Sequence, residues 1–182
     1  SEDEYIREDL RAVNMGEWPT QCFKAYDIRG LAGDELSDDF SYRLGRALAT
    51  YLDCNSFAVG RDIRKSSPGY ASNLIQGMVD SGVKVLDLGI VSTGCLYHAC
   101  WTLPVDGGVM ITASHLPMPT HNGFKMCRGT LPLAGEEIQE LKDWKSLLQV
   151  KVKLEKQKYN YSAVTPTQNL ILKTHTTNTM NT

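Results

Sequence analysis

The stretch GGVMITASHLPMPTHNGFK, residues 107–125, carries the clearest indication of fold and function in this chain. Its apolar run Val109–Ile111 predicts a buried strand. The small residues Thr112, Ala113 and Ser114 follow at once and predict a corner. In an open α/β sheet, such a corner lies in the crevice at the carboxyl ends of the strands, where ligands bind. We therefore expect the Ser114 hydroxyl to project into a functional crevice.

The residues after Ser114 add an imidazole and a cation. His115 follows directly, and Asn122-Gly123-Phe124-Lys125 ends a loop that contains proline. A hydroxyl, an imidazole and an ammonium group that converge on one anion would suit phosphate chemistry. A Ser followed by a His, taken alone, favours a solvated surface loop instead, so the interpretation depends on the rest of the sequence.

Two further motifs stand upstream, FKAYDIRG at residues 23–30 and VGRDIRKSS at residues 59–67. With the TASH and NGFK segments, in this order, they resemble the α-D-phosphohexomutases, the family of phosphoglucomutases and phosphomannomutases. The family's usual serine loop reads T-A-S-H-N-P. Here Leu116 replaces that Asn, and Thr120-His121 replaces a more typical pair, which bears on loop geometry more than on function. The resemblance covers about residues 21–150, the first of the family's four domains.

The resemblance implies a role for each site residue. Ser114 would carry a phosphate in the resting enzyme, pass it to a hexose phosphate and recover the other phosphate from a hexose 1,6-bisphosphate intermediate. One Mg²⁺ would be bound through the phosphate on Ser114. Lys125 and His115 would stabilise developing charge or move the sugar hydroxyl proton. Arg29 would orient the phosphate with its planar fork.

The substrate and its phosphates would contact a wider set of residues. By the resemblance these are Tyr26, Arg29, Arg61, Asn122 and Lys125. Arg29 has an alternative partner in Asp27, two residues before it. For the loop after Val59 we favour a structural role, in which Asp62 and Arg61 hold the loop while Ser66 or Ser67 caps the following helix.

Alternating strand and helix patterns predict a three-layer α/β/α domain with a mostly parallel mixed sheet, as in domain I of the phosphohexomutases. Predicted strands cover Phe23–Ile28, Phe57–Val59, Val83–Leu88 and Val109–Thr112, with an edge strand at Phe124–Cys127. The first predicted helix begins at a Ser37 N-cap, and the second ends near Gly82 and carries on one face Ala71, Leu74, Ile75, Met78 and Val79. A third, shorter helix includes Leu96, Cys100 and Leu103, and a fourth places inward Ile138, Leu141, Trp144 and Leu148.

Composition and length limit the remaining possibilities. The 182 residues are 42% hydrophobic and 22% charged, which is typical of a globular protein. The net charge of −2 does not suggest nucleic-acid binding, and we expect no membrane span. We expect an acidic extension over residues 1–20, the α/β/α domain over 21–150 and a polar, disordered tail over 151–182. The aspartate-rich metal loop, sugar-reading loop and distal-phosphate loop of the family are missing, so we expect the remaining mutase domains to be absent from this chain.

The five cysteines include no C-x-x-C pair, which predicts free thiols and a reducing compartment. We expect a cytoplasmic protein, with a plastid as the alternative. Cys95, His98 and Cys100 have a spacing that invites comparison with a metal site, but core packing is the stronger interpretation.

Two classes of function remain open. The chain is either the phosphoserine part of a hexose phosphomutase, inactive alone, or a non-catalytic domain that binds phosphosugars or a partner. A truncated product belongs with the second class.

Overall fold

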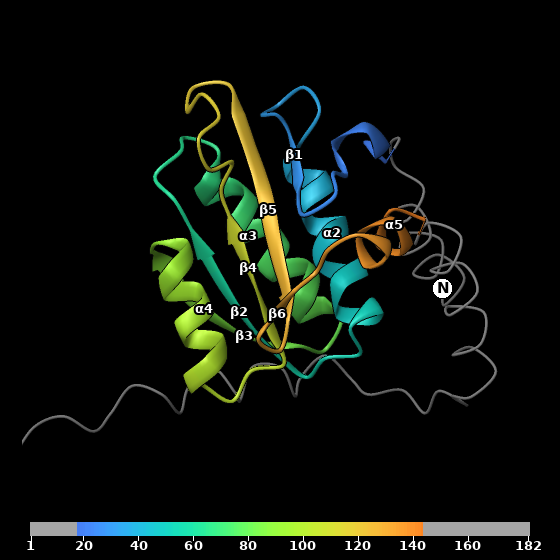
Figure 1. Ribbon diagram of the computed structural model, residues 1–182, viewed down its shortest axis with the longest axis vertical. Helices are drawn as coiled ribbons and strands as arrows, with labels where there is room; N and C mark the ends of the chain where they lie inside the picture. The colour runs from blue at the N-terminus through green and yellow to red at the C-terminus, as the bar shows by residue number, and fades with distance from the viewer. Residues whose placement is uncertain (1–17, 144–182) are drawn as a thin grey trace, which may run out of the picture. The chain divides into compact units, whose positions relative to one another are not determined.

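The computed structural model describes residues 18–143, which form one sheet with helices on both of its faces (Figure 1). The strands are β1 (Ile28–Leu31), β2 (Ser56–Arg61), β3 (Lys84–Ile90), β4 (Gly107–Ile111), β5 (His121–Arg128) and β6 (Leu131–Pro132). The helices are α2 (Asp38–Tyr51), α3 (Ser67–Asp80), α4 (Thr93–Thr102) and α5 (Glu136–Lys142), preceded by the short 3₁₀ helix η1 (Thr20–Cys22). None of the helices in this range is long and apolar enough to cross a membrane.

The sheet has the order β1-β5-β4-β2-β3, with β6 paired to β5. β2 is parallel to β3 and β4, whereas β5 is antiparallel to β4, β1 and β6. Of the described strands, β5 alone therefore runs against the others, which confirms the predicted mostly parallel mixed sheet. The prediction that residues 124–127 form an edge strand is wrong, because β1 pairs with the free side of β5.

Residues on the strands alternate between two cores, as the strand period of two requires. On β2, Phe57 and Val59 pack in the cluster that includes the inward residues of α2 and α3, while Ala58 packs with Leu96 and Cys100 of α4. Figure 1 shows α4 on one side of the sheet and α2 and α3 on the other. The three layers predicted from the sequence are therefore present.

The first strand begins later than predicted. Phe23 and Ile28 meet only as an isolated bridge, because the Lys24 amide donates a hydrogen bond of 2.8 Å to the Asp27 carbonyl and closes a turn between them. β1 follows as Ile28–Leu31. Its direction brings its carboxyl end to the same edge of the sheet as the end of β4.

The helices follow the predicted pattern, with two corrections. The Ser37 hydroxyl caps α2 by accepting a hydrogen bond of 3.0 Å from the Phe40 amide. Val79, predicted to share one face with Ala71 and Leu74, is exposed on the outer face of α3. Leu103, predicted to belong to the third helix, follows the end of α4 and is exposed. Ile138 and Leu141 of α5 are buried as predicted.

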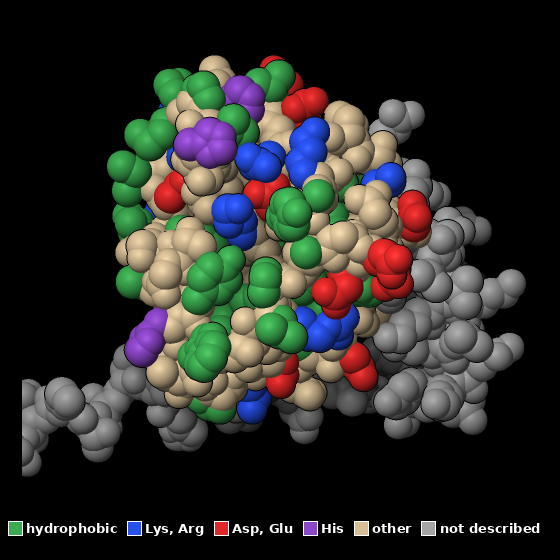
Figure 2. All heavy atoms as spheres, viewed as in Figure 1, with side chains coloured by type: hydrophobic (Ala, Val, Ile, Leu, Met, Phe, Trp, Pro, Cys, Tyr) green, Lys and Arg blue, Asp and Glu red, His purple; other side chains and the backbone are tan. Residues whose placement is uncertain are grey.

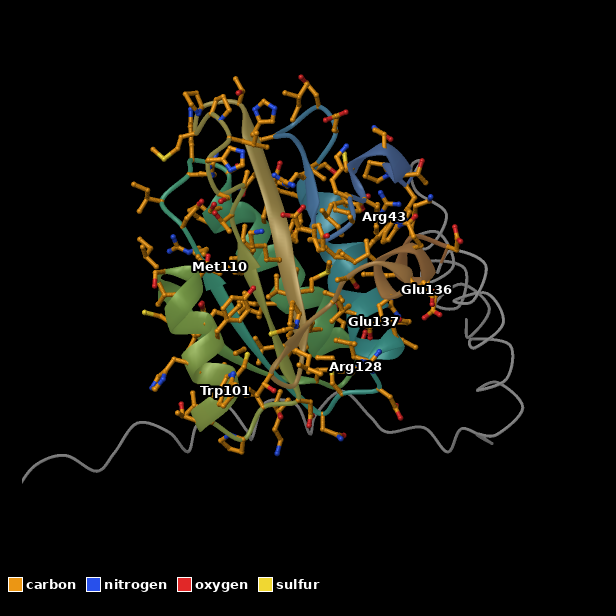
Figure 3. All side chains as sticks on the ribbon, viewed as in Figure 1. Arg43, Trp101, Met110, Arg128, Glu136 and Glu137 are labelled. Atoms are coloured by element: carbon orange, nitrogen blue, oxygen red, sulfur yellow. The ribbon has the colours of Figure 1, made fainter. Side chains whose placement is uncertain are left out.

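Trp18 packs against the domain although the sequence placed it in the N-terminal extension. Its ring centroid lies 5.0 Å from that of Phe40 and 5.6 Å from that of Phe23. The guanidinium of Arg43, labelled in Figure 3, lies 5.7 Å from the Trp18 ring centroid. The predicted tail over 151–182 and the predicted inward residues Trp144 and Leu148 lie outside the described residues.

Two glycines allow α2 and α3 to pack with their backbones close together. A Cβ atom at Gly45 would collide with the Leu74 carbonyl oxygen, and one at Gly77 would collide with the Tyr42 carbonyl oxygen. Neither obstacle can move aside as a side chain could, because both belong to helical backbone.

We predict that Gly77→Ala lowers the free energy of unfolding by about 1 to 3 kcal/mol, since it overpacks this crossing. The matched control is Gly94→Ala in α4, where the nearest atom to a new Cβ is the Ser92 Oγ at 3.7 Å. Urea denaturation should show an unchanged or higher stability for that variant, because alanine is the better helix former. Equal stability of the two variants would show that the close crossing is not a constraint.

Candidate functional site

Ser114 stands on a tight corner just beyond β4, at the carboxyl edge of the parallel strands. Its side chain is exposed, and its backbone has a φ of +55°, the left-handed region that costs a residue other than glycine roughly 1 to 2 kcal/mol. The corner is held on both sides. The Ser114 amide donates to Thr112 Oγ1 at 3.0 Å, and the Ser114 carbonyl accepts from Arg64 Nη2 at 2.8 Å.

Arg64 holds the whole serine loop to the loop after β2. The side chain is almost fully buried, with 3% of its surface exposed. Its Nη1 donates to the carbonyl oxygens of Pro117 and His121, each at 3.1 Å, and its Nε donates to Asp62 at 2.8 Å. With the bond to Ser114, one guanidinium joins the beginning and the end of the loop. Sequence analysis missed Arg64, although the RDIRKSS motif contains it.

Asp62 is the counter-charge of Arg64, whereas the structural interpretation of this loop names Arg61 beside Asp62. Its carboxylate also accepts from the Ser67 hydroxyl at 2.6 Å and from the Arg64 amide at 3.0 Å. Burial alone would raise the pKa of Asp62, but these donors together hold that pKa below its ordinary value. The carboxylate therefore adds stability above its unfolded pKa of about 3.9, and this is lost as the pH falls through the folded pKa.

The prediction that Ser66 or Ser67 caps α3 with its side chain is wrong. Ser66 occupies the N-cap position without a side-chain capping bond. Asn122 explains this, because its Nδ2 donates to the hydroxyl oxygens of both serines, at 2.8 and 3.0 Å. Asn122 is fully buried, and its Oδ1 accepts from the Gly123 amide at 2.9 Å. Its amide thus ties β5 to the start of α3.

Asp27 joins the two cations of the predicted site. Its carboxylate, 1% exposed, accepts from Arg29 Nε at 2.7 Å and from Lys125 Nζ at 2.9 Å. The anticipated Arg29–Asp27 pair is therefore present and extends to Lys125. Both cations remain about one quarter exposed, at 27% and 26%. Among the described residues, Nη1 and Nη2 of Arg29 have no hydrogen-bond partner, so this edge of the guanidinium can receive an anion.

Gly123 makes room for this cluster. A Cβ atom at Gly123 would lie 2.9 Å from the Arg29 Cγ and would collide with the carbonyl oxygen of Ile28. Arg29 and Gly123 are register partners on β1 and β5, so the side chain of Arg29 crosses over the glycine. The glycine of the NGFK motif is therefore required by the close approach of β1.

A cavity of about 500 Å³ opens beside Arg29. Its lining includes Tyr26 from the turn before β1, Arg29 from β1 itself and Glu35 from the segment after β1. Leu116 of the serine loop and His121 at the start of β5 also line it. Figure 2 shows Lys, Arg and His side chains gathered over the upper part of this face, above β1 and β5. Leu116 thus contributes an apolar side chain to the wall of this cavity. The loop still closes through the bond of 3.1 Å from the Leu116 amide to the Ala113 carbonyl.

The other predicted site residues lie outside this cavity. His115 is exposed, and Arg61 is half-buried at the end of β2. Ser114, His115, Arg61 and Lys125 do not line the cavity. Within residues 18–143, no hydrogen bond joins the Ser114 hydroxyl to Arg29, His115 or Lys125.

Between residues 18 and 143 there is no group of three or more His, Cys, Asp or Glu side chains able to hold a metal ion. Ser114, through a phosphate, would supply one oxygen ligand. Cys95 and His98 are exposed, so the prediction that they pack in the core is wrong for them, whereas Cys100 is buried.

Comparison with known proteins places this geometry among relatives. Residues 20–145 match the family model of phosphoglucomutase/phosphomannomutase, alpha/beta/alpha domain I. A phosphomannomutase of Klebsiella pneumoniae is 44% identical over 125 residues, which are 66% of this chain and 79% of that protein. A phosphoglucomutase of Neisseria gonorrhoeae is 48% identical over 130 residues, 70% of this chain and 28% of that protein.

Other relatives extend well beyond this chain. A phosphomannomutase of Salmonella montevideo is 46% identical over 116 residues, which are 63% of this chain but 25% of that protein. The crystal structure of a phosphoglucomutase/phosphomannomutase family protein from Burkholderia thailandensis superposes with a TM-score of 0.67 at 34% identity. That match covers 71% of this chain and 31% of the other. The chain thus spans about a quarter to a third of these longer relatives.

We predict that Arg64→Met lowers the free energy of unfolding by about 3 to 5 kcal/mol, because it leaves the Asp62 carboxylate partly buried without its cation. Hydrogen exchange at the Leu116 and His121 amides should speed up by more than global unfolding explains. Lys65→Met, an exposed neighbour with the same change of charge, is the control and should stay within about 0.5 kcal/mol. Exchange in the serine loop that is unchanged by Arg64→Lys would contradict the role assigned to the guanidinium fork.

Proposed function

Because the chain belongs to the phosphoglucomutase/phosphomannomutase family, a family of isomerases that transfer phosphoryl groups, we propose that it is the phosphoserine domain of a hexose phosphomutase. One observation carries the proposal. Ser114 presents its hydroxyl at the carboxyl edge of the sheet on a backbone corner that Arg64 and Thr112 hold in place. A solvated surface loop would need no buried arginine to fix such a conformation.

The phosphoryl carrier would be Ser114 Oγ. In the first half-reaction, the bond between phosphorus and this oxygen breaks while a bond forms to a hydroxyl oxygen of the hexose phosphate. The proton of that hydroxyl passes to a base of the site. His115, the residue directly after Ser114, is the proposed base. The reverse transfer then takes the second phosphate from the hexose 1,6-bisphosphate back to Ser114.

Arg29 and Lys125 would hold the phosphate during transfer. Asp27 uses one N–H of Arg29 and one of Lys125, so it fixes both side chains while leaving further donors for phosphate oxygens. The cluster of two cations and one carboxylate keeps a net charge of +1 beside the serine loop. Fixed donors that need not reorganise are the main way in which a protein stabilises a transferring phosphoryl group.

The cavity beside Arg29 is the proposed entry for the hexose phosphate. Tyr26 and His121 offer polar edges to a sugar, and Arg29 offers the cation for its phosphate. Arg61, from the end of β2, and Asn122, beneath the loop, would support the site from outside the cavity. When bound, Mg²⁺ would neutralise charge on the Ser114 phosphate, with its remaining protein ligands supplied from outside residues 18–143.

We predict that the 182-residue chain shows no mutase turnover with glucose 1-phosphate or mannose 1-phosphate. Its sequence contains neither the aspartate-rich metal loop nor the distal-phosphate loop of the family. A coupled assay with Mg²⁺ and a bisphosphate activator measures this. Turnover that disappears on Ser114→Ala would show that the chain is a complete catalyst.

We further predict that Ser114 is the hydroxyl that takes up phosphate from labelled glucose 1,6-bisphosphate, and peptide mapping identifies the labelled residue. Ser67→Ala, which removes a hydroxyl already committed to Asp62, is the control and should leave the label on Ser114. Asp27→Asn should reduce the rate of labelling, because Arg29 and Lys125 lose their common anchor. Label on Ser66 or Ser67 would refute the assignment, and binding of the bisphosphate without any label would favour a non-catalytic phosphosugar-binding domain.

A further inference from the structure

Two cysteines from different layers of the fold meet beneath α4. Cys100 lies near the end of α4, and Cys127 lies near the end of β5. Their sulfur atoms are 3.5 Å apart, close enough for a thiol–thiol hydrogen bond. Cys100 is 5% exposed and Cys127 is fully buried.

The packing around the pair keeps the two sulfurs together. They share a small apolar cluster with Ala58, Leu96 and Met110, and Figure 3 labels Met110 where α4 lies over the sheet. The Cys100 sulfur packs directly against the backbone of β4, because a Cβ atom added at Gly108 would lie only 2.8 Å from it. The Cys127 thiol is also within 3.5 Å of the Gly108 carbonyl. Closing a disulfide needs the sulfurs to approach by only roughly 1.5 Å.

We propose that Cys100 and Cys127 are a dithiol site, which a small-molecule disulfide converts into an intrachain disulfide. The resulting covalent ring runs from α4 through β4 and the serine loop to β5. It therefore encloses Ser114, His115, Asn122 and Lys125, while Arg29 and Asp27 remain outside. The proposal concerns the thiols alone and does not depend on the phosphoryl transfer assigned to Ser114.

The chemistry proceeds by two exchanges. The Cys100 thiolate attacks the disulfide of the oxidant and releases one thiolate, forming a mixed disulfide at Cys100. The Cys127 sulfur then attacks the Cys100 sulfur and releases the second thiolate, while the Cys127 proton passes to the released thiolate. Overall, two cysteine thiols are oxidised and one oxidant disulfide is reduced to two thiols. The hydrogen bond between the two thiols lowers the pKa of Cys100 and raises that of Cys127, which favours the Cys100 thiolate as the nucleophile that attacks the oxidant first.

The disulfide would stiffen the segment that carries the predicted site. It would tie α4 to β5, and Cys127 stands two residues after Lys125 on the same strand. A ring of this kind restricts the unfolded chain and stabilises the folded one. We expect the oxidised chain to unfold at a higher temperature and its serine loop to exchange amide hydrogens more slowly.

The test uses the chain with Cys95→Ala, which removes the exposed thiol, and incubates it with oxidised glutathione under native conditions. Denaturation, alkylation of the remaining thiols and peptide mapping then report the cross-links. We expect two of the four remaining thiols to be lost, with one peptide joining Cys100 to Cys127. Cys54→Ala, another buried cysteine, is the matched control and should keep that cross-link, whereas Cys100→Ala and Cys127→Ala should each abolish it.

Two results would overturn the proposal. The first is four reactive thiols after native incubation when the same chain, unfolded in urea, oxidises readily. The second is a cross-link that joins another pair, such as Cys22 with Cys54. A Cys100–Cys127 cross-link accompanied by a lower unfolding temperature would reject the stiffening effect.

Discussion

The buried guanidinium of Arg64 is the interaction on which the candidate site depends. A serine held in the left-handed region has no intrinsic reason to stay there, and the carbonyls of a proline-containing loop need donors once water is excluded. Arg64 supplies three of those donors and takes its counter-charge from Asp62. Arg64 therefore joins four parts of the chain into one unit. They are the loop after β2, the corner at Ser114, the middle of the serine loop and the start of β5.

The buried carboxylate of Asp27 organises the other half of the site in the same way. Asp27 fixes Arg29 and Lys125 from adjacent antiparallel strands, as Asp62 fixes Arg64. In both cases a carboxylate holds a cation, but the consequence differs. Arg64 donates its Nη hydrogen bonds to backbone carbonyls, so its role is structural. Arg29 and Lys125 remain partly exposed, and each keeps N–H donors that Asp27 does not use. Burial thus separates a structural arginine from the cations that we propose hold phosphate.

The layer order, the Ser37 cap and the strand before Ser114 could be predicted from the sequence, because they follow from local periodicity and capping chemistry. The central position of β5 could not, since its pairing with β1 joins residues nearly one hundred positions apart. The role of Arg64 and the bond from Lys125 to Asp27 could not be predicted either, because a motif records residue types and not which of several charged neighbours is buried. The serines before α3 were misassigned for the same reason, since the Asn122 amide reaches them from another strand.

The central claim is that the fold presents Ser114 so that its phosphate meets Arg29 and Lys125 while Arg64 keeps the corner in place. A crystal structure of the chain with phosphoserine incorporated at position 114 tests this most directly. The account predicts phosphate oxygens at about 2.7 to 2.9 Å from donors of Arg29 and Lys125, with the residue 114 carbonyl still bound to Arg64. A phosphate directed into solvent, with Arg29 and Lys125 bound only to Asp27, would contradict it.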